Sequence, residues 1–264
     1  MRPITDIVIV GSGNVAEALA AAVAAAEGVV LRGVAARNGA RAAEIADMAG
    51  GVWHGPIGEA PDAGLYLIAV SDRAVAEAAA ALPHRAGAVA AHTAGSVAAD
   101  VLRGAGFAAC GVVYPFQTFT AGRRVDFARV PLFVEGSDEE VTRRLEAFAA
   151  RLSRTVRRAS SERRRTIHLA GVLACNFVNA LYSMAADTLA SREGLPADVL
   201  HPLIEETARK AVYMTHPRDG QTGPAVRGDR AVAERHEAML EGEPLQREIY
   251  RLLTEYIWET SRRI

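Results

Sequence analysis

The stretch DIVIVGSGNVAEALAAA, residues 6–22, constrains the fold of this chain more than any other. It predicts a short apolar strand over residues 7–10, then a glycine turn and an alanine-rich helix. Gly11 allows a tight turn, Gly13 lets the backbone approach a pyrophosphate, and Ala16 lets the helix pack closely on the strand. The helix N-terminus would face the phosphates. The pattern predicts the first strand-turn-helix unit of a dinucleotide-binding fold; a turn that binds nothing is the alternative.

Composition narrows the class of protein and of partner. The 264 residues are enough for two domains or one large one, and the net charge of −1 gives no general attraction to nucleic acid or to anionic membranes. The two cysteines, Cys110 and Cys175, lack C-x-x-C spacing, so neither a disulfide framework nor a zinc site is indicated. We therefore expect no metal, and the cytoplasm is the expected compartment.

Two segments bear on targeting and membranes. The first six residues lead directly into the first predicted strand without the regions of a secretory signal. The most apolar later stretch, residues 169–189, carries Asn176, Asn179 and Asp187, which makes it a poor membrane span. Neither a membrane nor a nucleic acid is expected as a partner.

The chain changes character near residue 157. Before it, apolar segments typical of strands alternate with helical segments, which predicts a doubly wound (Rossmann) α/β fold with a mostly parallel sheet. After it, the pattern predicts only helices, over residues 161–191, 197–213, 230–241 and 245–262. We expect a dinucleotide-binding Rossmann-like domain at residues 1–157 and a helical domain at residues 158–264. The arginine-rich segment 157–165 at the join is either a solvated face or a patch for an anionic ligand or partner.

The end of the second predicted strand indicates which dinucleotide binds. An NAD site usually has an acid there, whereas Ala35-Ala36-Arg37-Asn38 has none. Arg37 can pair with a 2′-phosphate and Asn38 can donate beside it, so NADP(H) is favoured over NAD(H). A plain surface arginine is the alternative reading of Arg37. The predicted cofactor contacts are Gly11, Ser12, Gly13, Asn14, Val15, Arg37, Asn38, Val70, Ser71, Asp72 and Thr93, with capping of the next helix as the alternative for Asp72.

These motifs resemble a known group. The glycine turn, the 70–72 loop and the 92–96 loop look like the N-terminal domain of pyrroline-5-carboxylate reductase and its NADP-dependent relatives. The whole chain is more similar to a family of Rossmann-like NADP oxidoreductases with a helical C-terminal domain of unknown function, through residues 92–96, 114–119, the helix with His168 and Asn176, and residues 221–229. The resemblance implies a reductase or dehydrogenase and dimerisation through the helices. Residues 1–157 would then be the NADP-binding domain, and residues 158–264 the helical substrate and dimerisation domain.

One departure matters for mechanism. In β-hydroxyacid dehydrogenases a catalytic lysine stands one turn before an asparagine; if Asn176 matches that asparagine, Val172 occupies the lysine position. On an ideal α-helix His168 and Asn176 lie about 80° apart, and Asn179 lies about 20° from His168. The three could form a polar strip facing a cleft, or be satisfied polar groups at a helix–helix or dimer contact.

The proton-transfer candidates follow from side-chain chemistry. Histidine suits proton transfer near neutral pH, so His168 is the first choice as acid or base, and Asn176 would polarise the reacting oxygen or nitrogen. His92, at a strand end near the expected nicotinamide, is a second candidate, unless it only orients its own loop.

The substrate-binding candidates are polar groups on loops and on the long helix. They are Tyr114, Gln117, Thr118, Asn179, Thr222 and Arg227. Tyr114-Pro115 could instead simply turn the chain. Residues 221–229 look like a loop that completes its own or a partner's site, or a connecting turn with an internal Arg227–Asp229 pair, and Asp229 can cap the helix that follows.

The sequence thus predicts an NADP(H)-dependent oxidoreductase that moves a hydride between the nicotinamide and a small polar carbonyl, imine or alcohol. A non-catalytic NADP(H)-binding sensor is the alternative, because the lysine is missing.

Overall fold

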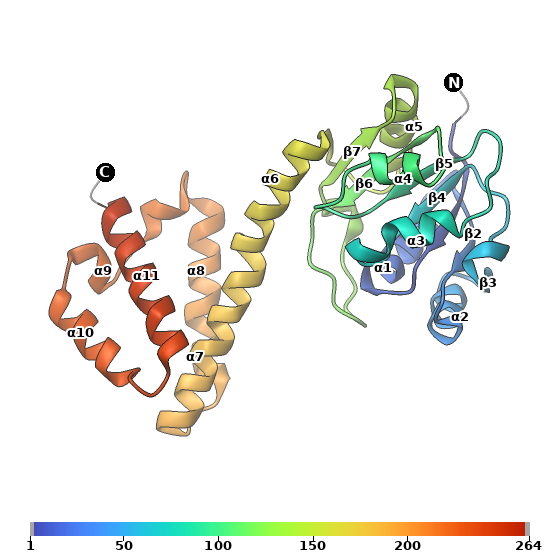
Figure 1. Cartoon of the computed structure of the whole chain (residues 1–264). Helices are drawn as coiled ribbons and strands as arrows, with labels where there is room; N and C mark the ends of the chain where they lie inside the picture. The colour runs from blue at the N-terminus through green and yellow to red at the C-terminus, as the bar shows by residue number, and fades with distance from the viewer. Residues whose placement is uncertain (1–2, 262–264) are drawn as a thin grey trace. The chain divides into compact units, whose positions relative to one another are not determined.

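The computed structural model describes residues 3–261. Contacts divide the chain into two compact units, Met1–Asn176 and Phe177–Ile264. The first contains an eight-stranded sheet with helices, and in the second the structure describes only helices (Figure 1). The predicted fold class, a mostly parallel α/β sheet followed by helices, is confirmed.

The sheet has the order β3-β2-β1-β4-β5-β6-β7-β8, and every neighbouring pair is parallel except β6 and β7. Its strands are β1 Asp6–Val10, β2 Val30–Ala35, β3 Trp53–Gly55, β4 Leu65–Ile68, β5 Val89–His92, β6 Cys110–Pro115, β7 Leu132–Gly136 and β8 Val156–Arg158. β8, which overlaps the start of the arginine-rich segment 157–165, was not predicted from the sequence.

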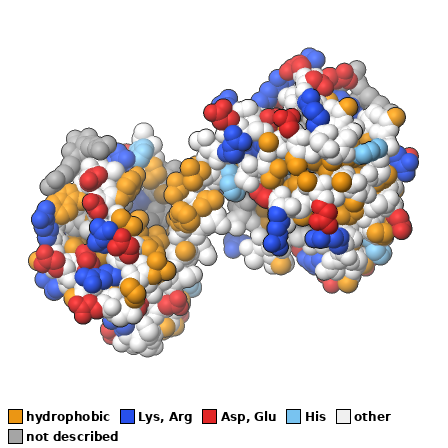
Figure 2. Space-filling model, viewed as in Figure 1, with side chains coloured by type: hydrophobic (Ala, Val, Ile, Leu, Met, Phe, Trp, Pro, Cys, Tyr) orange, Lys and Arg blue, Asp and Glu red, His pale blue; other side chains and the backbone are white. Residues whose placement is uncertain are grey.

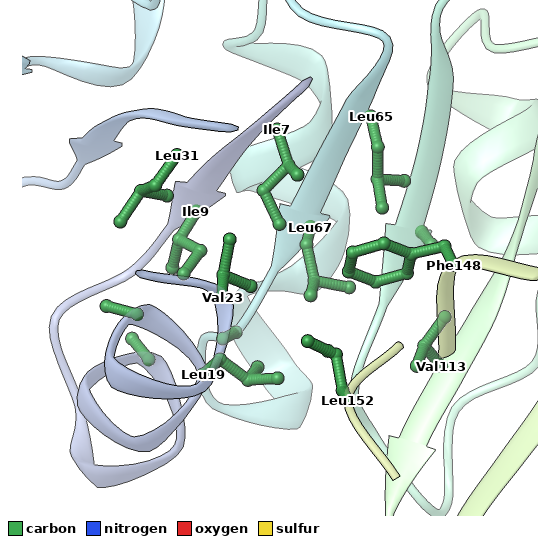
Figure 3. Close-up of a cluster of buried hydrophobic side chains, with 14 of the residues drawn as sticks. Ile7, Ile9, Leu19, Val23, Leu31, Leu65, Leu67, Val113, Phe148 and Leu152 are labelled. Carbon is green, nitrogen blue, oxygen red and sulfur yellow. The ribbon is translucent and has the colours of Figure 1, made fainter. Parts of the chain in front are cut away.

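Helices cover both faces of the sheet, as the alternating pattern requires. α1, α2 and α5 pack on the face that carries Ile7 and Ile9, while α3 and α4 pack on the face that carries Val8 and Val10 (Figures 1 and 3). Their bounds are α1 Asn14–Ala24, α2 Gly39–Met48, α3 Val75–Ala80, α4 Asp100–Gly104 and α5 Glu139–Ala149. Because both faces are buried, the central strands read as continuous apolar runs.

Strand order fixes where a ligand can bind. Along the chain the sheet grows from β1 to β3 in one direction and then restarts on the other side of β1 with β4. Val10 and Ile68, at the ends of β1 and β4, are neighbours in register. The loops that follow these strands therefore diverge and leave a crevice at this edge, the place where open α/β sheets bind ligands.

The long helix begins in the first unit and continues into the second. It consists of α6 Ser161–Gly171, a π-helical turn Val172–Asn176, and α7 Phe177–Glu193. The remaining helices are α8 His201–Tyr213, α9 Pro224–Arg227, α10 Arg230–Met239 and α11 Pro244–Ser261, with short 3₁₀ turns at Ala197–Leu200 and Pro217–Gly220. They agree with the predicted helices, and α9 lies in the predicted 221–229 loop; residue 262 of the last prediction lies outside the described residues.

The predicted domain boundary at residue 157 lies just before the end of β8. The contacts nevertheless group α6 with the sheet. The reason is local, because Ser161, Arg164 and His168 of α6 all bond to residues of the sheet domain.

The described part of the second unit has no core of its own. None of its described residues, 177–261, is buried. Among its exposed large apolar side chains are Phe177, Leu203, Val212, Tyr213, Leu245, Leu252 and Tyr256. Figure 2 shows such side chains, in orange, at the surface of this unit.

The helix run Ser161–Glu193 is long and apolar enough, by length and composition alone, to cross a membrane.

Candidate functional site

The glycine turn has the geometry that the sequence suggested. Gly11 has a φ of +129°, and a Cβ there would lie 2.2 Å from the Ala69 carbonyl oxygen, so only glycine fits. A Cβ on Gly13 would meet nothing within 4 Å, and Ala16, in the first turn of α1, is fully buried. Gly13 also lines a pocket, so its missing side chain leaves the backbone open to a ligand.

That pocket has a volume of about 1000 Å³ and lies in the first unit. Nine of the predicted cofactor contacts line it: Gly11, Ser12, Gly13, Asn14, Val15, Arg37, Asn38, Val70 and Ser71. Its size falls at the upper end of the usual range for ligand sites.

The N-terminus of α1 opens into the pocket without a side-chain cap. Its first N–H groups are therefore available to an anion. Glu17, in the first turn, would repel such an anion, but Arg41 forms an ion pair with it and also bonds Glu44 at 2.5 Å. Arg41 thus neutralises the acid beside the helix start. Asn14 donates from Nδ2 to the Phe119 carbonyl at 3.0 Å and joins α1 to the β6–β7 loop.

Two residues that follow β2, Arg37 and Asn38, line the pocket. Asn38 accepts from the Arg41 N–H through Oδ1 and caps α2, which leaves its Nδ2 free to donate. Arg37 lines the pocket with its side chain 74% exposed, and Nη1 lies 3.4 Å from Oε1 of Glu77 on α3. A planar guanidinium is thus available to a phosphate, with one carboxylate beside it.

Asp72 and Thr93 differ from the other predicted cofactor contacts. Asp72 accepts a hydrogen bond from the Ser96 hydroxyl, and neither the 3₁₀ turn Asp72–Ala74 nor α3 has a side-chain cap. The predicted capping role of Asp72 is therefore wrong. Thr93 is buried, and its hydroxyl donates to the Ile68 carbonyl at 3.4 Å. Both residues tie neighbouring loops together at the sheet edge.

His92 is fully buried at the end of β5. Its Nδ1 accepts from the Ala94 N–H at 3.2 Å, so Nε2 carries the proton and donates to the Ala98 carbonyl at 3.3 Å. Burial, helped by the Arg164 charge, lowers the pKa of His92 to about 4. With both nitrogens engaged and the ring neutral, this geometry favours the alternative reading, in which His92 orients its own loop.

Tyr114 and His168 meet beside the loop that follows β5. The Tyr114 hydroxyl lies 3.1 Å from Nδ1 of His168, and both side chains are half-buried. Gly95 packs against the pair, because a Cβ there would lie 2.6 Å from Nδ1 and 2.8 Å from Cζ of Tyr114. Folding thus joins a predicted substrate-binding residue to the predicted acid or base.

Arg164 fixes the same loop from the other side. It is 1% exposed, donates from Nε to the Ala94 carbonyl at 3.3 Å, and pairs through Nη1 with Glu135 at 2.5 Å. Burial alone would raise the pKa of Glu135, but bonds from Arg164 and Ser161 outweigh it and lower that pKa. The two roles predicted for the arginine-rich segment, a solvated face or a ligand patch, do not fit Arg164. Its side chain is buried and bonded to the sheet domain through Ala94 and Glu135.

The remaining predicted residues have exposed side chains. Asn176 is exposed in the π-helical turn, where fewer degrees separate successive residues, so the angle calculated for an ideal α-helix does not apply. Gln117, which lines the pocket, and Thr118 are also exposed. Asn179, Thr222 and Arg227 belong to the second unit and are likewise exposed. Asp229 caps α10 as predicted, accepting from the Val232 N–H at 3.1 Å.

Part of the pocket wall consists of residues that were not predicted from the sequence. Ala74, Ala78 and Ala81, spaced by four and three residues, line the pocket together with Glu77, Phe119 and the turn at residues 56–58. The spacing of these alanines, in α3 and at its two ends, could have indicated a helix face that a ligand can approach. Glu77 and Phe119 carried no such signal, because only folding brings them to the glycine turn.

Comparison with known proteins places the chain in a family. Residues 130–257 match the model of a domain of unknown function, DUF2520. The crystal structure of a "putative NADP oxidoreductase" from Bacteroides fragilis is 38% identical, with a TM-score of 0.87, and the match covers 97% of this chain and 98% of that one. No curated protein matched the chain.

Two more distant structures share the fold. A reductive aminase from Aspergillus terreus in complex with NADPH and ethyl-5-oxohexanoate is 17% identical, with a TM-score of 0.68 and coverage of 98% of this chain and 94% of that one. An imine reductase from Myxococcus stipitatus in complex with NADP⁺ is 15% identical, with a TM-score of 0.60 and coverage of 98% and 93%. The glycine turn, the pocket and the match over the full length together show that the chain belongs to the family of Rossmann-like NADP oxidoreductases with a DUF2520 domain.

Proposed function

We propose that this protein is an NADP(H)-dependent oxidoreductase that transfers a hydride between the nicotinamide and a small polar carbonyl, imine or alcohol. One observation carries the proposal: Gly13, at the uncapped start of α1, lines the pocket at the sheet's crevice, and a Cβ there would meet nothing within 4 Å. The pyrophosphate would accept from the N–H groups of that turn. The relatives named above as NADP(H) complexes support this choice of ligand.

Discrimination for the phosphorylated cofactor would rest on Arg37. No acid follows β2, Arg41 is engaged with Glu17 and Glu44, and Nδ2 of Asn38 can donate beside Arg37. A 2′-phosphate dianion would therefore meet one guanidinium and one amide.

The chemistry would be divided between cofactor and chain. Bound NADP(H) supplies or accepts the hydride. The chain orients the substrate and exchanges the proton, for which His168, held by Tyr114 beside Gly95, has the best geometry. The polarising role of Asn176 and the substrate contacts of Gln117, Thr118, Asn179, Thr222 and Arg227 remain proposals.

We also propose that the protein is a homodimer. The described part of the second unit has no buried residue and exposes many large apolar side chains, so it needs a partner surface to form a core. A second copy brings the same apolar surface and matches it by symmetry. The same pairing would cover the apolar helix run without a membrane. We propose a cytoplasmic location as well, where the thiols of Cys110 and Cys175 would stay reduced.

The first test is binding. We expect NADPH to bind at least ~10-fold more tightly than NADH, and Gly13→Ala to weaken NADPH binding at least ~10-fold, because its Cβ stands where the phosphates would approach. Gly104→Ala is the matched control, since its Cβ also meets nothing within 4 Å and Gly104 lies outside the pocket lining. Equal affinity for the two nucleotides would contradict the NADP assignment.

The second test separates an enzyme from a sensor. Purified protein is assayed for NADPH oxidation with a panel of keto acids, imines and aldehydes. Turnover that falls in His168→Ala while NADPH affinity persists supports the enzyme. Tight NADPH binding without turnover on any member of the panel favours the sensor.

A further inference from the structure

The hydrogen bond between Tyr114 and His168 can run in two directions. When His168 is neutral, the Tyr114 hydroxyl can donate to Nδ1, which leaves the ring proton on Nε2. When His168 is cationic, Nδ1–H donates to the Tyr114 oxygen instead. The Tyr114 O–H is then free to donate to a third atom.

The surroundings of Tyr114 oppose a phenolate. Burial raises the pKa of Tyr114 above its usual value, and the Asp72 carboxylate adds to the rise, while the Arg164 charge acts in the opposite direction. The rings of Phe116 and Phe133 lie 6.1 and 6.4 Å away, centroid to centroid. A relay that returns a proton to Tyr114 in the same step avoids the phenolate that these surroundings disfavour.

The position of Tyr114 in the chain favours it as the group nearer the reacting atom. It stands on β6, and the chain that follows β6 reaches the pocket wall at Gln117 and Phe119. Asp72, which acts electrostatically on Tyr114, directly follows Ser71 of the same wall. The cluster thus adjoins the cofactor pocket through two separate loops.

We propose, building on the oxidoreductase function above, that Tyr114 is the terminal proton donor and that His168 reprotonates it. During reduction the hydride adds to the carbon of the C=O or C=N bond, and the π electron pair moves to the oxygen or nitrogen. That atom takes the proton from Tyr114 Oη as Nδ1–H of His168 passes its proton to Oη. Tyr114 ends as a phenol and the imidazolium ends as neutral imidazole; oxidation runs the same steps backwards.

The kinetic test uses the substrate that the panel identifies. General acid catalysis is typically worth 10²- to 10⁴-fold, so we expect Tyr114→Phe and His168→Asn each to lower kcat by about 100-fold or more with NADPH affinity unchanged. Because the two residues act as a unit, the double variant should be no slower than the slower single variant. Because the relay needs the imidazolium form of His168, the wild-type rate should fall as the pH rises, and this fall should be absent in His168→Asn. Tyr66→Phe, a buried tyrosine bonded to the Pro61 carbonyl, is the matched control with unchanged kcat.

Two results would overturn the proposal. If Tyr114→Phe keeps kcat within about 10-fold and retains the pH dependence of the wild type, His168 donates directly and Tyr114 only positions it. Multiplicative losses in the double variant would show independent roles.

A measurement without turnover tests the pair itself. Nitrogen NMR of ¹⁵N-histidine-labelled protein should show neutral His168 protonated on Nε2 in the wild type and as a mixture of tautomers in Tyr114→Phe. An unchanged tautomer overturns the pairing even if no panel substrate reacts. If the wild type fails to bind NADPH, the oxidoreductase proposal is wrong, whereas the NMR result still decides whether Tyr114 controls His168.

Discussion

The buried His92 couples the stability of the loop that follows β5 to pH. His92 is neutral in the folded protein because its pKa is lowered from 6.5 to about 4, so the unfolded chain binds a proton more readily in that interval. The contribution of His92 to stability is therefore complete above pH 6.5 and is lost as the pH falls toward 4. The stretch from Ala94 to Ala98, which His92 holds, is among the parts that acid should loosen.

We predict that acid destabilises the wild type through His92. Between pH 7.5 and 5 the free energy of unfolding should fall by about 2 kcal/mol from this residue, as the pKa difference requires. Urea unfolding followed by circular dichroism measures the change. His92→Gln keeps a donor but does not titrate, so its stability should be lower at pH 7.5 and should depend less on pH. An equal pH dependence in both proteins would show that His92 is not the sensitive group.

A second residue-scale prediction concerns Glu77. Its carboxylate pairs with Arg37 at 3.4 Å inside the pocket and would lie near a 2′-phosphate. Since exposed ion pairs contribute roughly 0.2–1 kcal/mol, Glu77→Gln should tighten NADPH binding about 2- to 5-fold and leave NADH binding nearly unchanged. Fluorescence titration at low and high salt measures both constants, and the gain should shrink at high salt.

Glu140→Gln, in the first turn of α5 and outside the pocket lining, is the control for net charge. The same gain in Glu140→Gln, or no gain in Glu77→Gln, would show that the carboxylate beside Arg37 does not tune the site.

The role of a single residue could be predicted from the sequence when it depends on nearby residues, and could not when it depends on distant ones. The roles of Gly11 and Ala16 depend on neighbours a few residues away or in the adjacent strand, so the motif was sufficient. The roles of His92 and Arg164 depend on burial by distant segments, which the types of the neighbouring residues do not reveal. His168 was chosen for its chemistry alone, and its partner Tyr114, 54 residues away, was identified only in the folded structure.

Among the elements, periodicity predicted most of the fold. Strands buried on both faces and long helices leave strong patterns, whereas the three-residue β8 is short and partly exposed, so its pattern is weak. The π-helical turn Val172–Asn176 was also not predictable, since a five-residue change of pitch leaves no pattern of its own. Because of this change of pitch, the angle of about 80° calculated between His168 and Asn176 for an ideal α-helix does not apply.

The junction of α6 with the sheet is the element-scale prediction. Arg164→Met removes the guanidinium that bonds Glu135 and the Ala94 and Val97 carbonyls, and leaves the carboxylate of Glu135 without its charged partner. Breaking such a buried pair costs about 3 kcal/mol, at the low end of the usual range because Glu135 is 22% exposed. Urea unfolding measures the loss.

Two further variants make the Arg164 test specific. Glu135→Gln combined with Arg164→Met should recover part of the stability, because no uncompensated carboxylate remains. Arg158→Met removes an exposed arginine that pairs with Glu139 and Glu146 and should leave the unfolding midpoint nearly unchanged. Equal losses in Arg164→Met and Arg158→Met would contradict a bracing role for Arg164.

For the whole molecule, the two units differ in how they obtain a core. The first buries two apolar layers on its own sheet, around Ile9 on one face and Val10 on the other. The second has amphipathic helices such as α8 and α11 but no buried residue among those described. The helices of this unit were predicted from their sequence patterns alone. Such patterns show that a helix has an apolar face, but they do not show whether the same chain or a second copy buries it.

The last prediction tests that partner copy. Leu169, Leu173 and Phe177, spaced four residues apart on the long helix, are each more than half exposed, so Leu173→Asp places a charge within the proposed dimer surface. Analytical ultracentrifugation should show a dimer for the wild type and a shift toward monomer for Leu173→Asp, and the wild-type Tm should rise with protein concentration. Met48→Asp, an equally exposed apolar site on α2, should remain dimeric. A monomeric wild type with a Tm independent of concentration would mean that something other than a second copy covers the helices.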